Sequence, residues 1–141
     1  MIEPLHVGTV GGHPLRFFRS PLKDGRPDFP WHVVDDLHQC LGLNRDARRF
    51  FLRKLKGAEW GKNVRTIATA DGVVTVAPSY VAQGTVDAMV EEGMAPGSVR
   101  RDFDRASVDA MRKLGVPAAF GTDTWLRWMK AAMDRWESAG I

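Results

Sequence analysis

Polar and apolar residues alternate along the first third of the chain, as expected of β-strands that bury one face. The segments 5–10 (LHVGTV) and 14–20 (PLRFFRS) flank GGH, and adjacent glycines favour the tight turn of a hairpin. Residues 21–30 are rich in Pro, Asp and Gly and predict an exposed loop. After this loop, residues 31–34 (WHVV) predict a short third strand.

The hydrophobic period then changes to that of a helix. Leu37 and Leu41 are four residues apart, Asp35 is suited to cap the start, and Gly42 predicts an end after about two turns. Asn44 is a good N-cap for a second helix that follows at once. The sequence therefore predicts a short helix, a glycine-containing turn and a second helix.

The second helix is amphipathic and strongly basic. At about 100° per residue, one face gathers the apolar side chains of Ala47, Phe50, Phe51 and Leu55. The opposite face gathers the cations of Arg45, Arg48, Arg49, Arg53 and Lys56. The separation is imperfect, because Leu52 falls on the basic face and Lys54 on the apolar face.

A second hairpin and three helices are predicted beyond this helix. Residues 64–69 and 73–78 flank an Asp71-Gly72 pair, which is a strong hairpin signal and predicts a positive φ at Gly72. The first helix opens at Pro78 and Ser79, runs to about Glu92 and is followed by Gly93. The second is capped by Ser98, ends before Gly115 and has its core side at Val99, Phe103, Ala106, Ala110 and Leu114.

The third helix is capped by Thr122 or Asp123 and is rich in tryptophan. Its apolar stripe consists of Trp125, Trp128, Ala132 and Trp136. Such a stripe is most often core, but its breadth at a chain terminus also fits packing against a second protomer. A homodimer through 123–137 is the alternative to core packing.

Together these elements predict an α+β fold, with a small, mainly antiparallel sheet and packed helices, followed by two C-terminal helices. Residues 1–93 are expected to form the α+β domain. Residues 98–141 are expected to form a helical extension, separate or part of the same domain, with GMAPGS (93–98) as the candidate hinge.

Length and composition favour a soluble, cytoplasmic protein of one domain. The 141 residues suffice for a real core, and no apolar run approaches the roughly 20 residues of a membrane helix. The first ten residues lack a signal-peptide pattern. The single cysteine, Cys40, excludes an internal disulfide and suits a reducing compartment.

Positive charge is concentrated in one short segment. Residues 44–66 carry eight basic and two acidic side chains, a net of +6, whereas 1–43, 67–78 and 79–141 each carry a net of −1. Such a patch is an electrostatic footprint for a polyanion, and arginine can bond phosphates or guanine edges bidentately. The predicted DNA-binding residues are Arg45, Arg48, Arg49, Arg53, Lys54, Lys56, Lys62 and Arg65.

The order of short helix, turn and basic helix is that of a helix-turn-helix, in which the second helix contacts DNA. The alternative is an ordinary solvated helix face, which charge runs usually are. The stretch WHVVDDLHQCLGL carries a motif at Trp31, Asp36, Leu37, Leu41, Gly42 and Leu43. This motif resembles the N-terminal Bro-type domain of phage antirepressors and related viral proteins, and the later hairpin and helix extend the resemblance over residues 14–92. Leu43 stands where the family commonly has an aromatic residue, and residues 98–141 lie outside the resemblance.

The resemblance implies DNA binding and interference with regulators, mostly in phages and prophages, and it implies no catalytic residues. No P-loop, dinucleotide fingerprint, Gly-x-Ser-x-Gly or His-Glu-x-x-His pattern is present, so an enzyme is not expected. His32, His38 and Cys40 are close in sequence, but ligands at i and i+2 point to different helix faces. No metal or cofactor is therefore expected.

The sequence thus predicts a small DNA-binding regulatory protein of the phage antirepressor type, acting in transcription regulation through the basic helix at 45–56. The alternative is a non-enzymatic protein-binding module that antagonises a regulator or a host defence factor. Duplex DNA and a regulator protein are the expected partners, and no membrane is expected.

Overall fold

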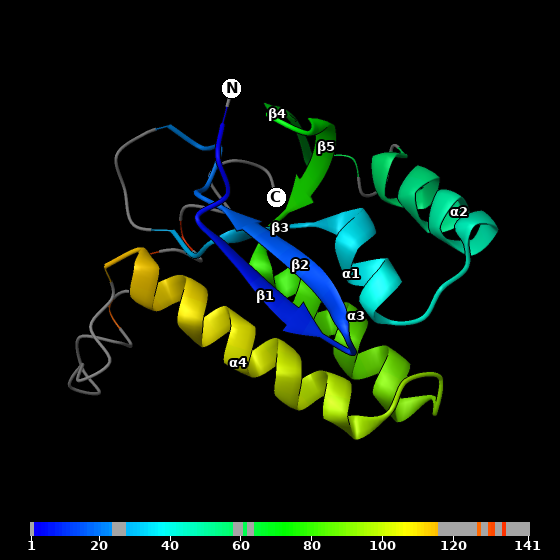
Figure 1. Cartoon of the computed structure of the whole chain (residues 1–141). Helices are drawn as coiled ribbons and strands as arrows, with labels where there is room; N and C mark the ends of the chain where they lie inside the picture. Colours follow the sequence, from blue (N-terminus) through cyan, green and yellow to red (C-terminus); the bar gives the residue numbers. More distant parts are fainter. Residues whose placement is uncertain are drawn as a thin grey trace.

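Two hairpins and a short central strand form one five-stranded sheet in the order β1-β2-β3-β5-β4 (Figure 1). The computed structural model describes residues 2–23, 28–57, 61, 64–115, 127, 130, 131 and 134. The elements in chain order are β1 (His6–Val10), β2 (His13–Phe18), β3 (Trp31–Val33), α1 (Val34–Cys40), α2 (Arg45–Lys56), β4 (Arg65–Thr69), β5 (Gly72–Ala77), α3 (Ser79–Glu91) and α4 (Gly97–Lys113). Neighbouring strands pair antiparallel throughout this sheet, so the predicted α+β fold is confirmed.

The first hairpin turns at its paired glycines, as predicted. Gly11 and Gly12 have φ angles of +57° and +79°. Two successive positive φ angles are typical of the type I′ turn, whose twist matches that of the flanking strands. Val10 and His13 pair directly across it.

The second hairpin turns one residue earlier than the predicted Asp71-Gly72 pair. Ala70 and Asp71 form the turn, and Gly72 pairs with Thr69 as the first residue of β5. The Thr69 hydroxyl donates to the carbonyl of Gly72 at 2.7 Å and accepts from the backbone N–H of Asp71 at 3.2 Å. Gly72 has a φ of +118°, so the predicted positive φ is confirmed.

Helix ends follow the glycines, whereas two of the predicted helix starts are wrong. Gly42, Gly93 and Gly115 have positive φ angles just past the ends of α1, α3 and α4. Neither Asp35 nor Ser98 is an N-cap, because each lies inside the first turn of its helix. Extended backbone leads into both helices, and Asp35 instead places its negative charge at the positive end of the α1 dipole.

The main apolar core lies between the sheet and helices α1, α3 and α4. It joins Leu15 and Phe17 of β2 to Leu37 of α1, Val86 of α3 and Phe103 of α4. The predicted core side of α4 is confirmed at its four buried positions, Val99, Phe103, Ala106 and Ala110. Helix α4 therefore shares one core with the sheet.

A glycine in β1 allows α4 to approach this strand closely. A Cβ atom at Gly8 would lie 2.6 Å from the Cβ of Ala106, a distance that real Cβ contacts essentially never show. The Asp102 carboxylate accepts a hydrogen bond from the backbone N–H of Gly11 at 3.1 Å. Figure 1 shows the resulting course of α4 along the first hairpin.

The predicted last helix lies largely outside the described residues. Arg127, Lys130, Ala131 and Asp134 are helical, and Lys130 Nζ is 3.1 Å from a carboxylate oxygen of Asp134. The tryptophans of this segment, and with them the predicted dimer contact through 123–137, lie outside the described part of the chain.

Candidate nucleic-acid interface

The turn between α1 and α2 is built from local signals in the sequence. Gly42 has a φ of +79°, and the N–H of Leu43 donates to the carbonyl of His38 at 3.1 Å, which ends α1. The side-chain oxygen of Asn44 accepts from the N–H of Ala47 at 2.9 Å, which starts α2. The predicted cap at Asn44 is confirmed, and four residues separate the end of α1 from the start of α2.

An arginine holds α2 against α1. Arg48 Nε donates to Asp35 Oδ1 at 3.1 Å, and its Nη1 donates to the carbonyl of Leu43 at 2.9 Å. The Arg48 side chain is only 24% exposed. Although Arg48 was predicted to bind DNA, its guanidinium is engaged within the protein.

The face of α2 that contacts the body differs from the predicted apolar face. Leu52 and Leu55 are partly buried against Val34, Val64 and Ala77. Phe50 and Phe51 remain 49% and 39% exposed, and none of the twelve residues of α2 is fully buried. The body therefore contacts the side that carries Arg48 and Leu52, and Phe50, which was predicted on the apolar face, is half exposed to solvent.

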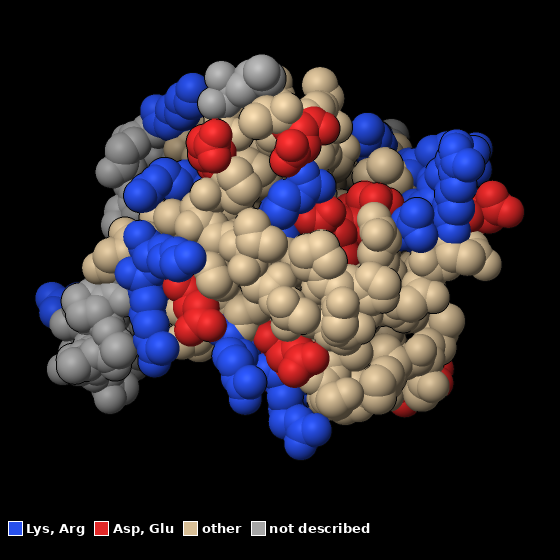
Figure 2. Space-filling model, viewed as in Figure 1, with Lys and Arg blue, Asp and Glu red and all other residues tan. Residues whose placement is uncertain are grey.

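Four cations line the solvent-facing side of α2 and are called the basic stripe here: Arg45, Arg49, Arg53 and Lys56. Their spacing of four, four and three residues keeps them on one side of the helix. All four are exposed, and none has an ion pair with another residue of the described segments. Figure 2 shows lysine and arginine side chains gathered over α2.

Two other predicted DNA-binding residues, Lys54 and Arg65, lie outside the basic stripe. Lys54 lies on another side of α2, with its ammonium 5.5 Å from the centre of the Phe50 ring. Arg65 begins β4, and its Nη1 donates to the carbonyl of Val64 at 2.9 Å. Lys62 lies outside the described residues.

The dimensions of α2 suit a DNA groove. A helix of twelve residues is about 18 Å long and roughly 10–12 Å wide with its side chains, close to the width of the major groove. Asp46 is the single acid in the helix and lies in its first turn. Part of the positive charge also has a structural role, since the cations of the last turn interact favourably with the helix dipole.

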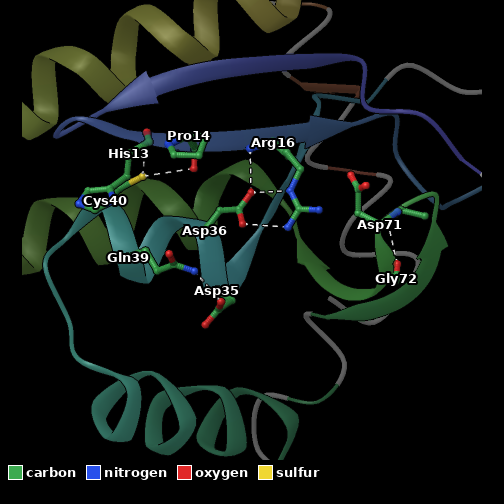
Figure 3. A network of polar contacts seen from close by, with 10 residues as sticks. His13, Pro14, Arg16, Asp35, Asp36, Gln39, Cys40, Asp71 and Gly72 are labelled. Carbon is green, nitrogen blue, oxygen red and sulfur yellow. Dashed lines mark hydrogen bonds and ion pairs between the residues drawn. The ribbon is translucent and has the colours of Figure 1, made fainter.

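A partly buried ion pair fixes α1, against which α2 packs. Asp36 Oδ2 accepts hydrogen bonds from the backbone N–H of Arg16 at 3.0 Å and from its Nε at 2.8 Å, and Oδ1 accepts from Nη2 at 3.0 Å (Figure 3). The side-chain hydrogen bonds to Asp36 raise the pKa of the Arg16 guanidinium. Asp36 therefore joins α1 to β2.

The histidines and the cysteine near α1 are buried in the interior of the protein. Burial lowers the pKa of His32 to about 3 and also lowers that of His38, so both imidazoles are neutral at pH 7. Burial raises the pKa of Cys40 to about 12, and its thiol donates to the carbonyls of His13 and Pro14 at 3.6 and 3.8 Å. Within the described residues, no group of three or more His, Cys, Asp or Glu side chains is arranged to hold a metal ion.

Comparison with known proteins gives this chain no relative: no family model, curated protein or solved structure matches it. Among the helices that the structure describes, none is long and apolar enough to cross a membrane.

Proposed function

We propose that this protein is a small DNA-binding regulatory protein that contacts duplex DNA through α2. The observation that carries the proposal is the basic stripe: Arg45, Arg49, Arg53 and Lys56 are exposed on one side of a helix. The α1–turn–α2 unit supports that helix as a helix-turn-helix supports its second helix. No catalytic step, cofactor or metal is part of this proposal.

The proposed contact is mainly electrostatic. Each arginine of the stripe would meet a phosphate or a guanine edge with its planar fork, and each phosphate contact would release counterions from the DNA. Four such contacts predict a slope of log K against log salt of about −3.6. The anchored Arg48 would not contribute, because its fork already binds Asp35 and the carbonyl of Leu43.

The resemblance of residues 14–92 to the Bro-type domain supports the same function and suggests the kind of regulator that this protein is. We therefore propose a regulator of the phage antirepressor type, working in the cytoplasm and interfering with a second regulator. Packing of the tryptophan-rich segment 123–137 against another protomer would supply two linked DNA-binding units.

The test is salt-dependent binding of the protein to random and genomic duplex DNA. Replacing Arg45, Arg49 and Arg53 together by Ala should leave the fold intact, because these side chains face solvent. Affinity should fall, and the salt slope should flatten by up to about three units.

The matched control removes the same charge from another helix. Arg101, Arg105 and Arg112 are exposed on α4, and their replacement by Ala should change the slope far less. Equal effects of the two triple variants would assign the binding to net charge and not to α2. Absence of binding by the wild-type protein at low salt would favour the protein-binding alternative.

A further inference from the structure

A second surface of α2 forms one wall of an apolar groove. The groove has a volume of about 600 Å³ and lies between α2 and α3. Phe51 and Leu55 line it from α2, and Val81, Ala88 and Met89 line it from α3. This wall of α2 is separate from the basic stripe.

His38, Thr85 and Gly84 line the groove with uncharged groups. Burial keeps the pKa of His38 below its usual value, so its ring is neutral at pH 7, and it contacts Phe51 edge-on at 5.9 Å. The Thr85 hydroxyl donates to the carbonyl of Val81 at 2.8 Å and is thereby satisfied within α3. Gly84 adds no side chain, and a Cβ placed there would have no atom within 4 Å.

Charge distinguishes one end of the groove from the other. Lys54 is the one charged side chain among the described residues that line it. Lys54 lies in the last turns of α2, whereas Leu43 precedes the helix, so roughly 15 Å of helix separates the two ends. Leu43 and Met89 pack against the main core at the apolar end, and Tyr80 lines the groove from the first turn of α3.

Volume favours a small molecule over a protein segment. Small-molecule sites are typically apolar clefts of about 300–1,000 Å³ with a few polar groups that fix orientation. A partner helix about 10 Å wide and as long as the lined part of α3 would occupy roughly 1,000 Å³, so it would fit only partly. Lys54 lines one end of the groove, and its ammonium, which lies 5.5 Å from the centre of the exposed Phe50 ring, would turn towards the groove to meet a single anionic group.

We propose that the α2–α3 groove binds a free single-chain carboxylic acid. Its carboxylate lies at Lys54, and its hydrocarbon chain runs past Gly84 towards Leu43 and Met89. This site is independent of the proposed DNA contact, because it uses a different side of α2.

The test is calorimetric titration of the full-length protein with decanoate, in the absence of DNA. Decanoate should bind with one-to-one stoichiometry, and decyltrimethylammonium, which has the same chain and the opposite charge, should bind more weakly. Lys54→Glu should weaken decanoate binding about fivefold. Arg105→Glu makes the same change of charge on α4 and should leave decanoate binding unchanged.

Gly84 offers a variant that fills the groove without disturbing the fold. Gly84→Leu should abolish decanoate binding and should not lower the melting temperature, because glycine is unfavourable within a helix and the space is open. Gly84→Ala should retain binding. Two results would overturn the proposal. One is decanoate binding by Gly84→Leu, and the other is binding of decyltrimethylammonium to the wild-type protein with the same affinity as decanoate.

Absence of decanoate binding would also overturn it. In that case, sedimentation of the wild-type protein and of Gly84→Leu shows whether a second copy of the chain covers the groove. A dimer that Gly84→Leu dissociates would identify that copy as the occupant in place of a carboxylic acid.

Discussion

Gly72 begins β5 with a φ of +118°, a backbone conformation that residues with a side chain rarely adopt. Gly72→Val should therefore lower the free energy of unfolding by about 1 kcal/mol or more. Chemical denaturation measures this change. Gly84→Ala is the control, because it also adds a Cβ in open space but lies in a helix with an ordinary φ, and it should not destabilise the protein.

Because His32 is buried, we expect the free energy of unfolding to fall in mild acid. Burial lowers the pKa of His32 from 6.5 to about 3. The unfolded chain therefore binds a proton below pH 6.5 that the folded protein does not accept until about pH 3. The stabilisation is fully present above pH 6.5 and falls by up to about 1.4 kcal/mol per pH unit below it. Burial lowers the pKa values of His6 and His38 as well, so their contributions have the same sign.

Denaturation at pH 7.5, 6.5 and 5.5 would measure this dependence. His32→Leu should reduce the slope of unfolding free energy against pH. Val33→Ala, a cavity-forming change at the next residue of β3, should lower the free energy at every pH and leave the slope as it is. A slope in His32→Leu equal to that of the wild-type protein would exclude His32 as its source.

At the scale of the element, two adjacent arginines of α2 have different roles. Arg48 is bonded to Asp35 and to the carbonyl of Leu43, whereas Arg49 belongs to the basic stripe. Arg48→Ala should lower the free energy of unfolding by about 1 kcal/mol, because it removes partly buried, charge-assisted hydrogen bonds. Arg49→Ala should leave stability unchanged within about 0.5 kcal/mol and should weaken DNA binding.

Denaturation and DNA titration of both variants separate the two roles. Equal stabilities would show that Arg48 does not hold α2 in solution. An undiminished DNA affinity of Arg49→Ala would remove Arg49 from the interface.

The same helix shows what sequence can and cannot predict. Asn44 and Gly42 mark the helix ends correctly, because capping depends on residues within one turn. The orientation of α2 depends instead on tertiary contacts. Leu52 faces the body although the helical period places it on the basic face, and Phe50 faces solvent although the period places it on the apolar face. The helical period predicts an apolar face and a basic face of α2. Because a few residues fall on the wrong face, the period does not decide which side of the helix packs against the body.

Across the protein as a whole, features that depend on neighbouring residues were predictable from the sequence, whereas features that depend on contacts between distant residues were not. The α+β fold class follows from hairpin and helix signals, and these are local. The ion pair between Arg16 and Asp36 joins positions 20 residues apart, and the α2–α3 groove arises only when the two helices are brought side by side. The position of the basic segment was predictable from charge, whereas the separation of Arg48 and Lys54 from the basic stripe required the structure.

The proposed function depends on contact between DNA and the basic stripe of α2. The most direct measurement follows the side-chain Nε–H signals of the arginines by nuclear magnetic resonance while a short duplex is added at low salt. We predict that the signals of Arg45, Arg49 and Arg53 shift together, while those of Arg101 and Arg105 on α4 stay unchanged. Shifts confined to α4 or to the β4–β5 hairpin, or no shifts at all, would contradict the proposed contact.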